Sequence, residues 1–459
     1  MTSSGTLPLE TDKRLAKCPK LRVLVVGKSG AGKSSLINHV FGIKQQVTVV
    51  SHNAPGICNI EDEITSPDNR HLVLHDSMGF EPGQDANLKK AINFLRARSA
   101  ENVAIQDQVH VVWLCIKIPH AGGRVLETGD EEFIQFALDK NVPLIVVFTQ
   151  FDKLQTRIEQ ELTEAEMELS DCEAIVAQRS EKKFVEICDI PLRKSQPLLP
   201  YVRTSVGICM DEGALKSLVH TTRDKVENRV WFVTTVAQRR SPRDKVDGSI
   251  EYVIGIPGYW RGLASTTKLF GSTLENCLRT IHFEITASWN FNDPDEFLAS
   301  EAFKQRIYSL IQFLVPEDKE IRSWFDDVDR FQTLIGIGTT ITAAAGPVLV
   351  AIGLSKMFVE WIASRYVQTP EALRCLMAYI CDLTLIMDHL FLETLDLPPP
   401  RHLTQAHIDS AVESYQKSSA WKVHNELRMY ANSMTFAQIV QSNRAEEKVQ
   451  EIIDLYCSK

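Results

Sequence analysis

An eight-residue glycine-rich segment near the N-terminus constrains the fold of this chain more than any other feature. Residues 27–34 read G-K-S-G-A-G-K-S and fit the pattern G-x-x-x-x-G-K-[ST] at each fixed position. An apolar run at 21–26 precedes this phosphate loop, and a helical pattern at 33–41 follows it. A glycine loop between a buried strand and a helix lets backbone N–H groups converge on a phosphate at the positive end of the helix dipole. We therefore expect a phosphate-binding site within an α/β domain.

Strand and helix patterns alternate through the first half of the chain. Short apolar runs at 71–75, 109–116 and 143–148 are separated by helical patterns at 87–98 and 131–140, and a final strand is expected at 201–205. Apolar strands that alternate with helices indicate a mostly parallel sheet covered by helices on both faces. The charged segment 154–183 carries apolar residues at helical intervals, which predicts one long solvated helix, with a partner surface as the alternative.

The alternation stops near residue 225, and helical patterns bounded by prolines continue to the end of the chain. We predict three regions: a flexible N-terminal tail at 1–19, a P-loop nucleotide-binding domain at 20–222, and a mainly α-helical C-terminal region at 223–459. A short basic cluster at 239–243 is expected to be a solvated linker, with a contact to anionic lipid as the alternative.

The composition excludes several classes of protein. A chain of 459 residues with 44% hydrophobic and 24% charged residues is expected to fold into more than one globular domain. Its 50 Lys and Arg against 59 Asp and Glu give a net charge of −9, so no nucleic-acid partner is expected. The ten cysteines lack metal-type spacing, which predicts reduced, mostly buried thiols and a cytoplasmic location.

Several polar side chains are placed to handle phosphate and a divalent cation. Lys33 would reach the β- and γ-phosphates, the Ser34 hydroxyl would ligate Mg²⁺, and Ser35 would contact the α-phosphate. A D-x-x-G pattern follows the strand at 71–75, at the edge of the sheet where ligands bind. There Asp76 would hold Mg²⁺ through water, and the Gly79 N–H would contact the γ-phosphate.

The sequence T-Q-F-D at 149–152 also follows a strand, and its last residue suits the recognition of guanine. A carboxylate only accepts hydrogen bonds, and the guanine edge offers two donors, N1–H and the 2-amino group. Adenine would turn a lone pair towards Asp152, and a buried unpaired polar group costs about 1–3 kcal/mol. The alternative of an ATP-binding protein is therefore disfavoured.

The order of these motifs resembles the Ras-like G domain of the translation-factor class of P-loop GTPases, over roughly residues 20–222. The stretches 73–83, 118–124 and 259–265 resemble those of a group of fungal G-domain-containing proteins. The resemblance implies that the ligands are GTP and GDP, bound with Mg²⁺. It also implies a last loop at 204–205, whose backbone meets guanine O6. The residues expected at the nucleotide are Gly27, Ser29, Gly30, Ala31, Gly32, Lys33, Ser34, Ser35, Asp76, Gly79, Thr149, Gln150, Asp152, Thr204 and Ser205.

Two departures from the family pattern bear on hydrolysis. Phe80 stands where many small GTPases carry a Gln that orients the attacking water, and a phenyl ring cannot do so. Gln84 is the first candidate to replace it. His75 and Glu81 are weaker candidates. The family's switch Thr, a Mg²⁺ ligand, has only imperfect counterparts in the residues at 48 and 51. We expect slow or partner-assisted hydrolysis, with Lys33 as the main catalytic side chain.

Two apolar runs stand out in the C-terminal region. Residues 331–355 carry no charge and exceed the ~20 residues that cross a bilayer, but Gly and Pro at 346–347 interrupt them. A buried hairpin and a membrane contact both remain open for this run. The run at 373–397 includes charges at 374, 382, 388 and 393, which indicates a core-facing helix.

Two functions follow from these features. The first is a nucleotide-dependent switch, a slow or assisted GTPase whose helical region reports the state of the nucleotide to a protein effector. The second is a nucleotide-stabilised scaffold whose helical half forms a homo-oligomer or contacts membrane, with hydrolysis incidental.

Overall fold

The computed structural model describes residues 10–41, 59–66, 69–80, 85–100, 102–119, 123–164, 172–205, 212–226, 228–250, 271–311, 370–433 and 444–458. The chain divides into two compact units. The first unit comprises residues 12–244 and 398–401, and the helical unit comprises residues 1–11, 245–397 and 402–459.

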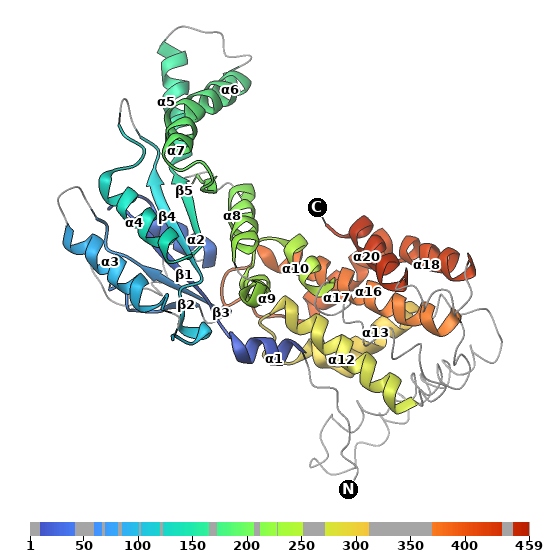
Figure 1. Ribbon diagram of the computed structural model, residues 1–459. Helices are drawn as coiled ribbons and strands as arrows, with labels where there is room; N and C mark the ends of the chain where they lie inside the picture. Colours follow the sequence, from blue (N-terminus) through green and yellow to red (C-terminus); the bar gives the residue numbers. More distant parts are fainter. Residues whose placement is uncertain are drawn as a thin grey trace. The chain divides into compact units, whose positions relative to one another are not determined.

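A six-stranded sheet organises the first unit (Figure 1). Its strands are β1 (Leu21–Gly27), β2 (Ile64–Ser66), β3 (Asn69–Asp76), β4 (Val111–Lys117), β5 (Leu144–Thr149) and β6 (Tyr201–Arg203). They lie in the order β2-β3-β1-β4-β5-β6, and each neighbouring pair is parallel except β2 with β3. The predicted α/β fold class, with a mostly parallel sheet followed by a helical region, is confirmed.

Helices cover both faces of the sheet because its strands are apolar on both sides. In β1, Leu24 and Val26 pack into one core, whereas Val23 and Val25 pack into the other. The first core contains side chains of α3 (Asp85–Ala97), α4 (Thr128–Asp139), α5 (Phe151–Glu164), α6 (Cys172–Phe184) and α7 (Ile190–Ser195). The second contains side chains of α2 (Lys33–Phe41), α8 (Glu212–Lys225) and α9 (Asn228–Ala237).

The expectation of one long solvated helix at 154–183 is wrong. The structure has two helices there, α5 and α6, which pack side by side (Figure 1). The apolar residues at helical intervals face the core, because Leu154, Ile158 and Leu162 on α5 are all buried. The hydrophobic spacing predicted the helical conformation but not the division into a helical pair.

Other segments expected to be loose are also structured. Helix α1 (Glu10–Lys17) lies within the segment expected to be a flexible tail. In the basic cluster at 239–243, Arg240 is buried and donates to the carbonyl of His39, so the expectation of a solvated linker is wrong at this residue. The first unit extends to residue 244, beyond the expected end at 222, because α8 and α9 cover the sheet. For example, Trp113 Nε1 on β4 donates to Thr222 Oγ1 on α8 over 3.0 Å.

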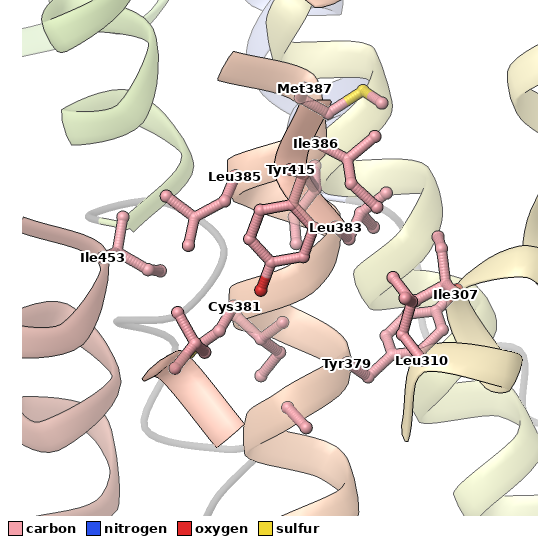
Figure 2. Packing of buried hydrophobic residues seen from close by; sticks show 14 of the residues in the cluster. Ile307, Leu310, Tyr379, Cys381, Leu383, Leu385, Ile386, Met387, Tyr415 and Ile453 are labelled. Atoms are coloured by element: carbon pink, nitrogen blue, oxygen red, sulfur yellow. The ribbon is translucent and has the colours of Figure 1, made fainter. Parts of the chain in front are cut away.

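The helical unit is built around α16 (Pro370–Leu395). This helix packs against α12 (Gly271–Trp289), α13 (Glu301–Ile311), α17 (Gln405–Tyr415), α18 (Trp421–Ser433) and α20 (Arg444–Tyr456). Figure 2 shows its side chains Tyr379, Cys381 and Leu385 lying among those of neighbouring helices, such as Ile307 and Ile453. The predicted core-facing helix at 373–397 is therefore confirmed, and most of its length is buried.

Within the described residues, the segment 374–395 of α16 alone has the length and apolar composition to cross a membrane. Most of this segment is buried inside the helical unit, where it packs as a core helix. The uncharged run at 331–355 lies outside the described residues.

A buried polar cluster joins three helices of this unit. Asp382 on α16 is fully buried, and its Oδ1 accepts from the Tyr415 hydroxyl over 2.5 Å. His424 Nε2 on α18 lies 3.0 Å from Oδ1 and 2.9 Å from Oδ2 of the same carboxylate. Both oxygens of this buried carboxylate therefore have partners, as a stable core requires.

The cysteines fit the prediction of buried thiols. In the part of the chain that the structure describes, six cysteines are buried and form no disulfide bond, namely Cys18, Cys115, Cys188, Cys375, Cys381 and Cys457.

Candidate functional site

The phosphate loop (residues 27–34) leaves the carboxyl end of β1 in a conformation that needs glycine. Gly27, Gly30 and Gly32 have φ angles of 140°, 68° and 80°. At Gly27 a Cβ atom would lie 2.2 Å from the carbonyl oxygen of Cys115 on β4, so no other residue fits. The loop then enters α2, the element order that the sequence predicted.

Lys33 lies over this loop. It begins α2, is buried, and its Nζ donates to the carbonyl oxygens of Gly27 over 3.0 Å and Lys28 over 2.9 Å. Ser34 and Ser35 follow it in the first turn, and both are exposed. An ammonium group fixed over a glycine loop provides the positive charge that a bound phosphate requires.

Asp76 ends β3, beside the phosphate loop. In the register of the sheet it pairs with Val25 of β1, and the Ser34 hydroxyl lies 3.4 Å from its Oδ2. Burial raises the pKa of the Asp76 carboxyl to about 6, although the Lys33 ammonium and the Ser34 hydroxyl oppose this shift. Its Oδ1 is buried and has no hydrogen-bond partner among the residues that the structure describes.

The oxygen atoms of Ser34 and Asp76 suit the coordination of Mg²⁺ together with a nucleotide. Magnesium prefers oxygen ligands, keeps several waters, and is typically held by one or two protein groups together with substrate phosphates. The Ser34 hydroxyl and the unpartnered oxygen of Asp76 provide such a set. Within the described ranges, no group of three or more His, Cys, Asp and Glu side chains is placed to hold a metal by itself.

The D-x-x-G segment lies directly against the phosphate loop. A Cβ atom on Gly79 would lie 2.2 Å from the backbone nitrogen of Ser29, and Asn87 Nδ2 donates to the Gly79 carbonyl over 2.9 Å. The next residue, Phe80, is buried, and its ring stacks on Phe133 with centroids 6.2 Å apart. Phe80 is therefore a core residue and has no polar group for orienting water.

His75 is not available for catalysis, so its prediction as a weak candidate is wrong. It is buried on β3, where Nδ1–H donates to the Ile60 carbonyl over 2.9 Å and Nε2 lies 3.3 Å from an Arg22 nitrogen. Burial lowers its pKa to about 4, which leaves a neutral, structural imidazole. The other candidates for positioning water or Mg²⁺, which are Gln84, Glu81 and the residues at 48 and 51, lie outside the described residues.

The base motif is connected to the phosphate loop by two side chains. Thr149, fully buried at the end of β5, donates its hydroxyl hydrogen to the Ala31 carbonyl over 2.9 Å. Gln150, in a left-handed conformation with φ 64°, donates from Nε2 to the Gly30 carbonyl over 3.0 Å. Thr149 and Gln150 thus hold the two loops together, a role that sequence reasoning missed.

Two oxygens in the base motif are placed to accept hydrogen bonds. Asp152 lies in the first turn of α5, and its Oδ1 is buried, as is Gln150 Oε1. Neither oxygen has a hydrogen-bond partner in the part of the chain that the structure describes. A carboxylate with an unused buried oxygen suits the two donors on the guanine edge.

The predicted last loop lies beside the base motif. The N–H of Thr204 donates to the Phe148 carbonyl over 2.6 Å, and the N–H of Phe151 donates to the Thr204 carbonyl over 3.3 Å. Thr204 is buried and Ser205 is half-buried. The carboxyl ends of β5 and β6 therefore bring the residues at 149–152 and 204–205 together, as the motif order predicted.

An ion pair at the phosphate loop was not predicted. Lys28 Nζ lies 3.1 Å from Glu127 Oε1, and each side chain is about one-third exposed. Glu127 also caps α4, because Glu127 and Asp130 hydrogen-bond to each other's backbone N–H. No signal in the sequence could have paired these residues, since Lys28 occupies an unspecified position of the motif.

Comparisons with known proteins agree with this geometry. The family model described as 50S ribosome-binding GTPase matches residues 22–150, and a domain of unknown function, DUF8505, matches residues 297–459. The probable GTP-binding protein EngB of Porphyromonas gingivalis is 28% identical over 158 residues, which cover 34% of this chain and 73% of that protein. GTPase Era of Chromobacterium violaceum is 25% identical over 186 residues, which cover 39% of this chain and 57% of that protein.

Solved structures were also found. A probable GTP-binding protein engB matches with a TM-score of 0.27 and 18% identity, over 44% of this chain and 99% of that chain. NFeoB from S. thermophilus, bound to GDP·AlF4⁻ and K⁺, matches with a TM-score of 0.25 and 14% identity, over 75% of this chain and 99% of that chain. By the family model and the curated relatives, the first unit contains a domain that is similar to the G domains of P-loop GTPases such as EngB and Era.

Proposed function

We propose that this protein binds GTP and GDP with Mg²⁺, hydrolyses GTP to GDP and phosphate slowly or with a partner's help, and acts as a nucleotide-dependent switch. One observation carries the proposal: the phosphate loop, with Lys33 over it, is joined to the base motif by the hydrogen bonds from Thr149 and Gln150. A nucleoside phosphate has a base at one end and phosphates at the other, so it suits such a pair of joined loops.

Each predicted residue has a role in this proposal. Backbone N–H groups of the phosphate loop, from Gly27 to Ser34, surround the β-phosphate, Lys33 neutralises the β- and γ-phosphates, and Ser35 contacts the α-phosphate. Asp152 accepts from the guanine edge, next to the loop at 204–205. Ser34 and Asp76 would hold Mg²⁺, which supplies charge neutralisation for phosphoryl transfer when bound.

Slow or assisted hydrolysis follows from the residue after D-x-x-G. Phe80 is packed against Phe133, so this position contributes no hydrogen bond to water. Lys33 remains to stabilise the charge that develops on the phosphates. We keep Gln84 as the proposed water-positioning residue. A partner that supplies this group would raise the rate, as partner proteins do for other GTPases.

A switch requires that the two nucleotide states differ. The Gly79 backbone, which lies against Ser29, is the proposed sensor of the γ-phosphate. The helical unit would report the state to an effector or to a second copy of the chain. We propose a cytoplasmic location, with membrane contact through 331–355 as an alternative, and the resemblance to the fungal group stays a prediction.

Competition binding tests the nucleotide site. A fluorescent GTP analogue is bound with Mg²⁺ and displaced by GTP, GDP, ATP or XTP. Guanine nucleotides are expected to displace it at least tenfold better than ATP, and Lys33→Ala is expected to abolish binding. The Asp152→Asn variant should lose GTP and gain XTP, because the xanthine 2-oxo group accepts where guanine donates. Equal displacement by ATP would refute the guanine site.

A second experiment measures GTP hydrolysis and the response of the protein to the bound nucleotide. Phosphate release is expected to be slow for the protein alone, and Lys33→Ala should abolish it. Oligomeric state and liposome binding are then compared in the GDP, non-hydrolysable GTP and nucleotide-free forms. A difference among the three forms supports the switch, whereas equal behaviour favours the nucleotide-stabilised scaffold.

A further inference from the structure

A cavity of about 530 Å³ opens between α5, α6 and the end of β4. Its volume falls within the roughly 300–1,000 Å³ typical of sites for small molecules. The lining residues are Ile118, Pro119, Gly123, Gln150, Leu154, Arg157, Ile158, Glu161, Arg179, Lys183, Ile187 and Pro191. Of the described residues assigned above to the nucleotide, Gln150 alone lines it. The cavity is therefore a separate site that shares one residue with the base motif.

The floor of the cavity is apolar. Ile118, Leu154 and Ile158 are each less than a tenth exposed, and Leu154 and Ile158 lie one turn apart on α5. Pro119 and Pro191 add further apolar surface. A ligand with an apolar body would lose its hydration against these side chains, which is the main source of affinity in small-molecule sites.

The rim of the cavity is positively charged. Arg157, Arg179 and Lys183 supply three cations, and Glu161 is the one carboxylate among the described lining residues. Glu161 pairs with Arg157 over 3.2 Å, which neutralises that arginine. Lys183 pairs over 3.2 Å with Glu186, which lies outside the lining. Arg179, one turn before Lys183 on α6, has no ion pair within the described ranges. Charge complementarity therefore favours an anion.

We propose that this cavity binds a small organic anion, with an apolar body on the floor and a carboxylate, sulfonate or phosphate group at Arg179 and Lys183. The bound anion changes the affinity of the neighbouring site for guanine nucleotide, a second part that rests on the proposed function.

Gln150 provides the physical connection. Its side chain lines the cavity, and its amide donates to the Gly30 carbonyl of the phosphate loop over 3.0 Å. A ligand that contacts Gln150 changes the geometry of this hydrogen bond and hence of the loop that surrounds the phosphates. Coupling between two sites is reciprocal, so bound GDP must change the affinity for the anion by the same factor.

The first test uses the dye 1-anilinonaphthalene-8-sulfonate, which has an aromatic body and one sulfonate. Its fluorescence is titrated with the full-length protein without nucleotide. We expect one saturable site that Arg179→Glu or Lys183→Glu weakens about five- to tenfold, since reversal of a facing charge removes an attraction and adds a repulsion. Lys182→Glu, on the same helix but outside the cavity, should leave the affinity unchanged. Equal effects of the 179 and 182 variants would overturn the proposal.

The second test separates coupling from competition. With increasing GDP, the dissociation constant of the dye should change and then reach a plateau, and Gln150→Ala should remove the change. A dissociation constant that rises without limit would show that dye and GDP share one site, which would overturn the separate cavity. GDP binding is measured in the same samples with a fluorescent analogue. If GDP fails to bind, the proposed function falls, but the result with the dye still decides whether the cavity binds an anion.

Discussion

Two buried aspartates, one in each unit, differ in how their oxygens are used. Asp382 in the helical unit has partners for both oxygens, from Tyr415 and His424. Asp76 in the first unit has the Ser34 hydroxyl at one oxygen, while the other has no partner among the described residues. A core normally satisfies its buried polar groups, and the second oxygen of Asp76 is open to a ligand at the edge of the phosphate loop.

This difference distinguishes a structural carboxylate from one that the proposed function uses as a ligand of Mg²⁺. Asp382 contributes to the stability of three packed helices, whereas burial of Asp76 costs stability and leaves an oxygen available for Mg²⁺. Asp152 has the same property as Asp76, because its Oδ1 is buried without a partner in the described part of the chain. The comparison predicts opposite effects on stability when the two kinds of carboxylate are removed.

The largest effect is expected for Asp382→Ala. The change leaves His424 and Tyr415 buried without their common partner, and the loss of one member of such a cluster costs about 3–5 kcal/mol. Thermal unfolding and hydrogen exchange in α16, α17 and α18 measure it. Asp409→Ala on α17 is the control, because Asp409 pairs with Arg306 at the surface and should cost less than about 1 kcal/mol. Similar losses for both variants would contradict the comparison.

The opposite sign is expected for Asp76→Asn. The folded-state pKa of about 6 lies above the ordinary 3.8, so the folded chain holds the proton more tightly than the unfolded chain. The extra proton affinity of the folded Asp76 carboxyl stabilises the fold fully below about pH 4, and this stabilisation is lost as the pH rises through 6. At pH 7 the variant should therefore be more stable than the wild type, by on the order of 2–3 kcal/mol, while it loses Mg²⁺-dependent GTP binding.

Urea unfolding of nucleotide-free protein between pH 4 and pH 8 measures this gain. Asp139→Asn, an exposed aspartate on α4, is the control and should not alter the pH dependence. A variant at position 76 that is less stable than the wild type at pH 7 would show that this carboxylate is structural after all.

A smaller effect is expected for Thr149→Val, which keeps the shape of the side chain and removes the hydroxyl donor. The Ala31 carbonyl loses this hydrogen bond, at a cost of about 1–2 kcal/mol of stability. Affinity for GDP should fall about five- to tenfold, because the phosphate loop is then less fixed before binding. Calorimetric titration measures the affinity. Thr163→Val, whose hydroxyl is exposed on α5, should change neither quantity.

The smallest effect is expected for Lys28→Ala. The pair with Glu127 is about one-third exposed on each side, so its loss should cost no more than about 1 kcal/mol. A double-mutant cycle with Glu127→Gln isolates the pair, and high salt should reduce the coupling further. A coupling energy above about 2 kcal/mol would show that this pair behaves like the buried cluster at Asp382 and not like an exposed ion pair.

The sequence patterns predicted the parts of the fold that depend on local signals. The glycine pattern at 27–34 and the apolar runs that became β1, β3, β4 and β5 are such signals, and the final strand expected at 201–205 became β6. The separation of α5 from α6 was missed because the sequence between them, 165–171, contains neither Gly nor Pro. A hydrophobic period alone does not show where one helix ends and a partner begins.

The missed parts of the site depend on contacts between distant residues. Thr149 and Ala31 lie 118 positions apart, and Arg240 and His39 lie 201 apart. A sequence motif identifies Thr149 as part of a base site, but only the folded sheet brings its hydroxyl to the phosphate loop. In the same way, the sequence offers His75 as a weaker candidate for orienting water, but the sheet turns its side chain towards Ile60.

The hydrogen bonds from Thr149 and Gln150 also determine how the site measures a ligand. These hydrogen bonds hold the base loop and the phosphate loop at a fixed spacing before a nucleotide binds. A guanosine without phosphates would contact only the base loop, and a triphosphate without its base would contact only the phosphate loop. Under the proposed function, the spacing between the two loops therefore selects a nucleotide by the distance from its base to its phosphates as well as by its chemistry.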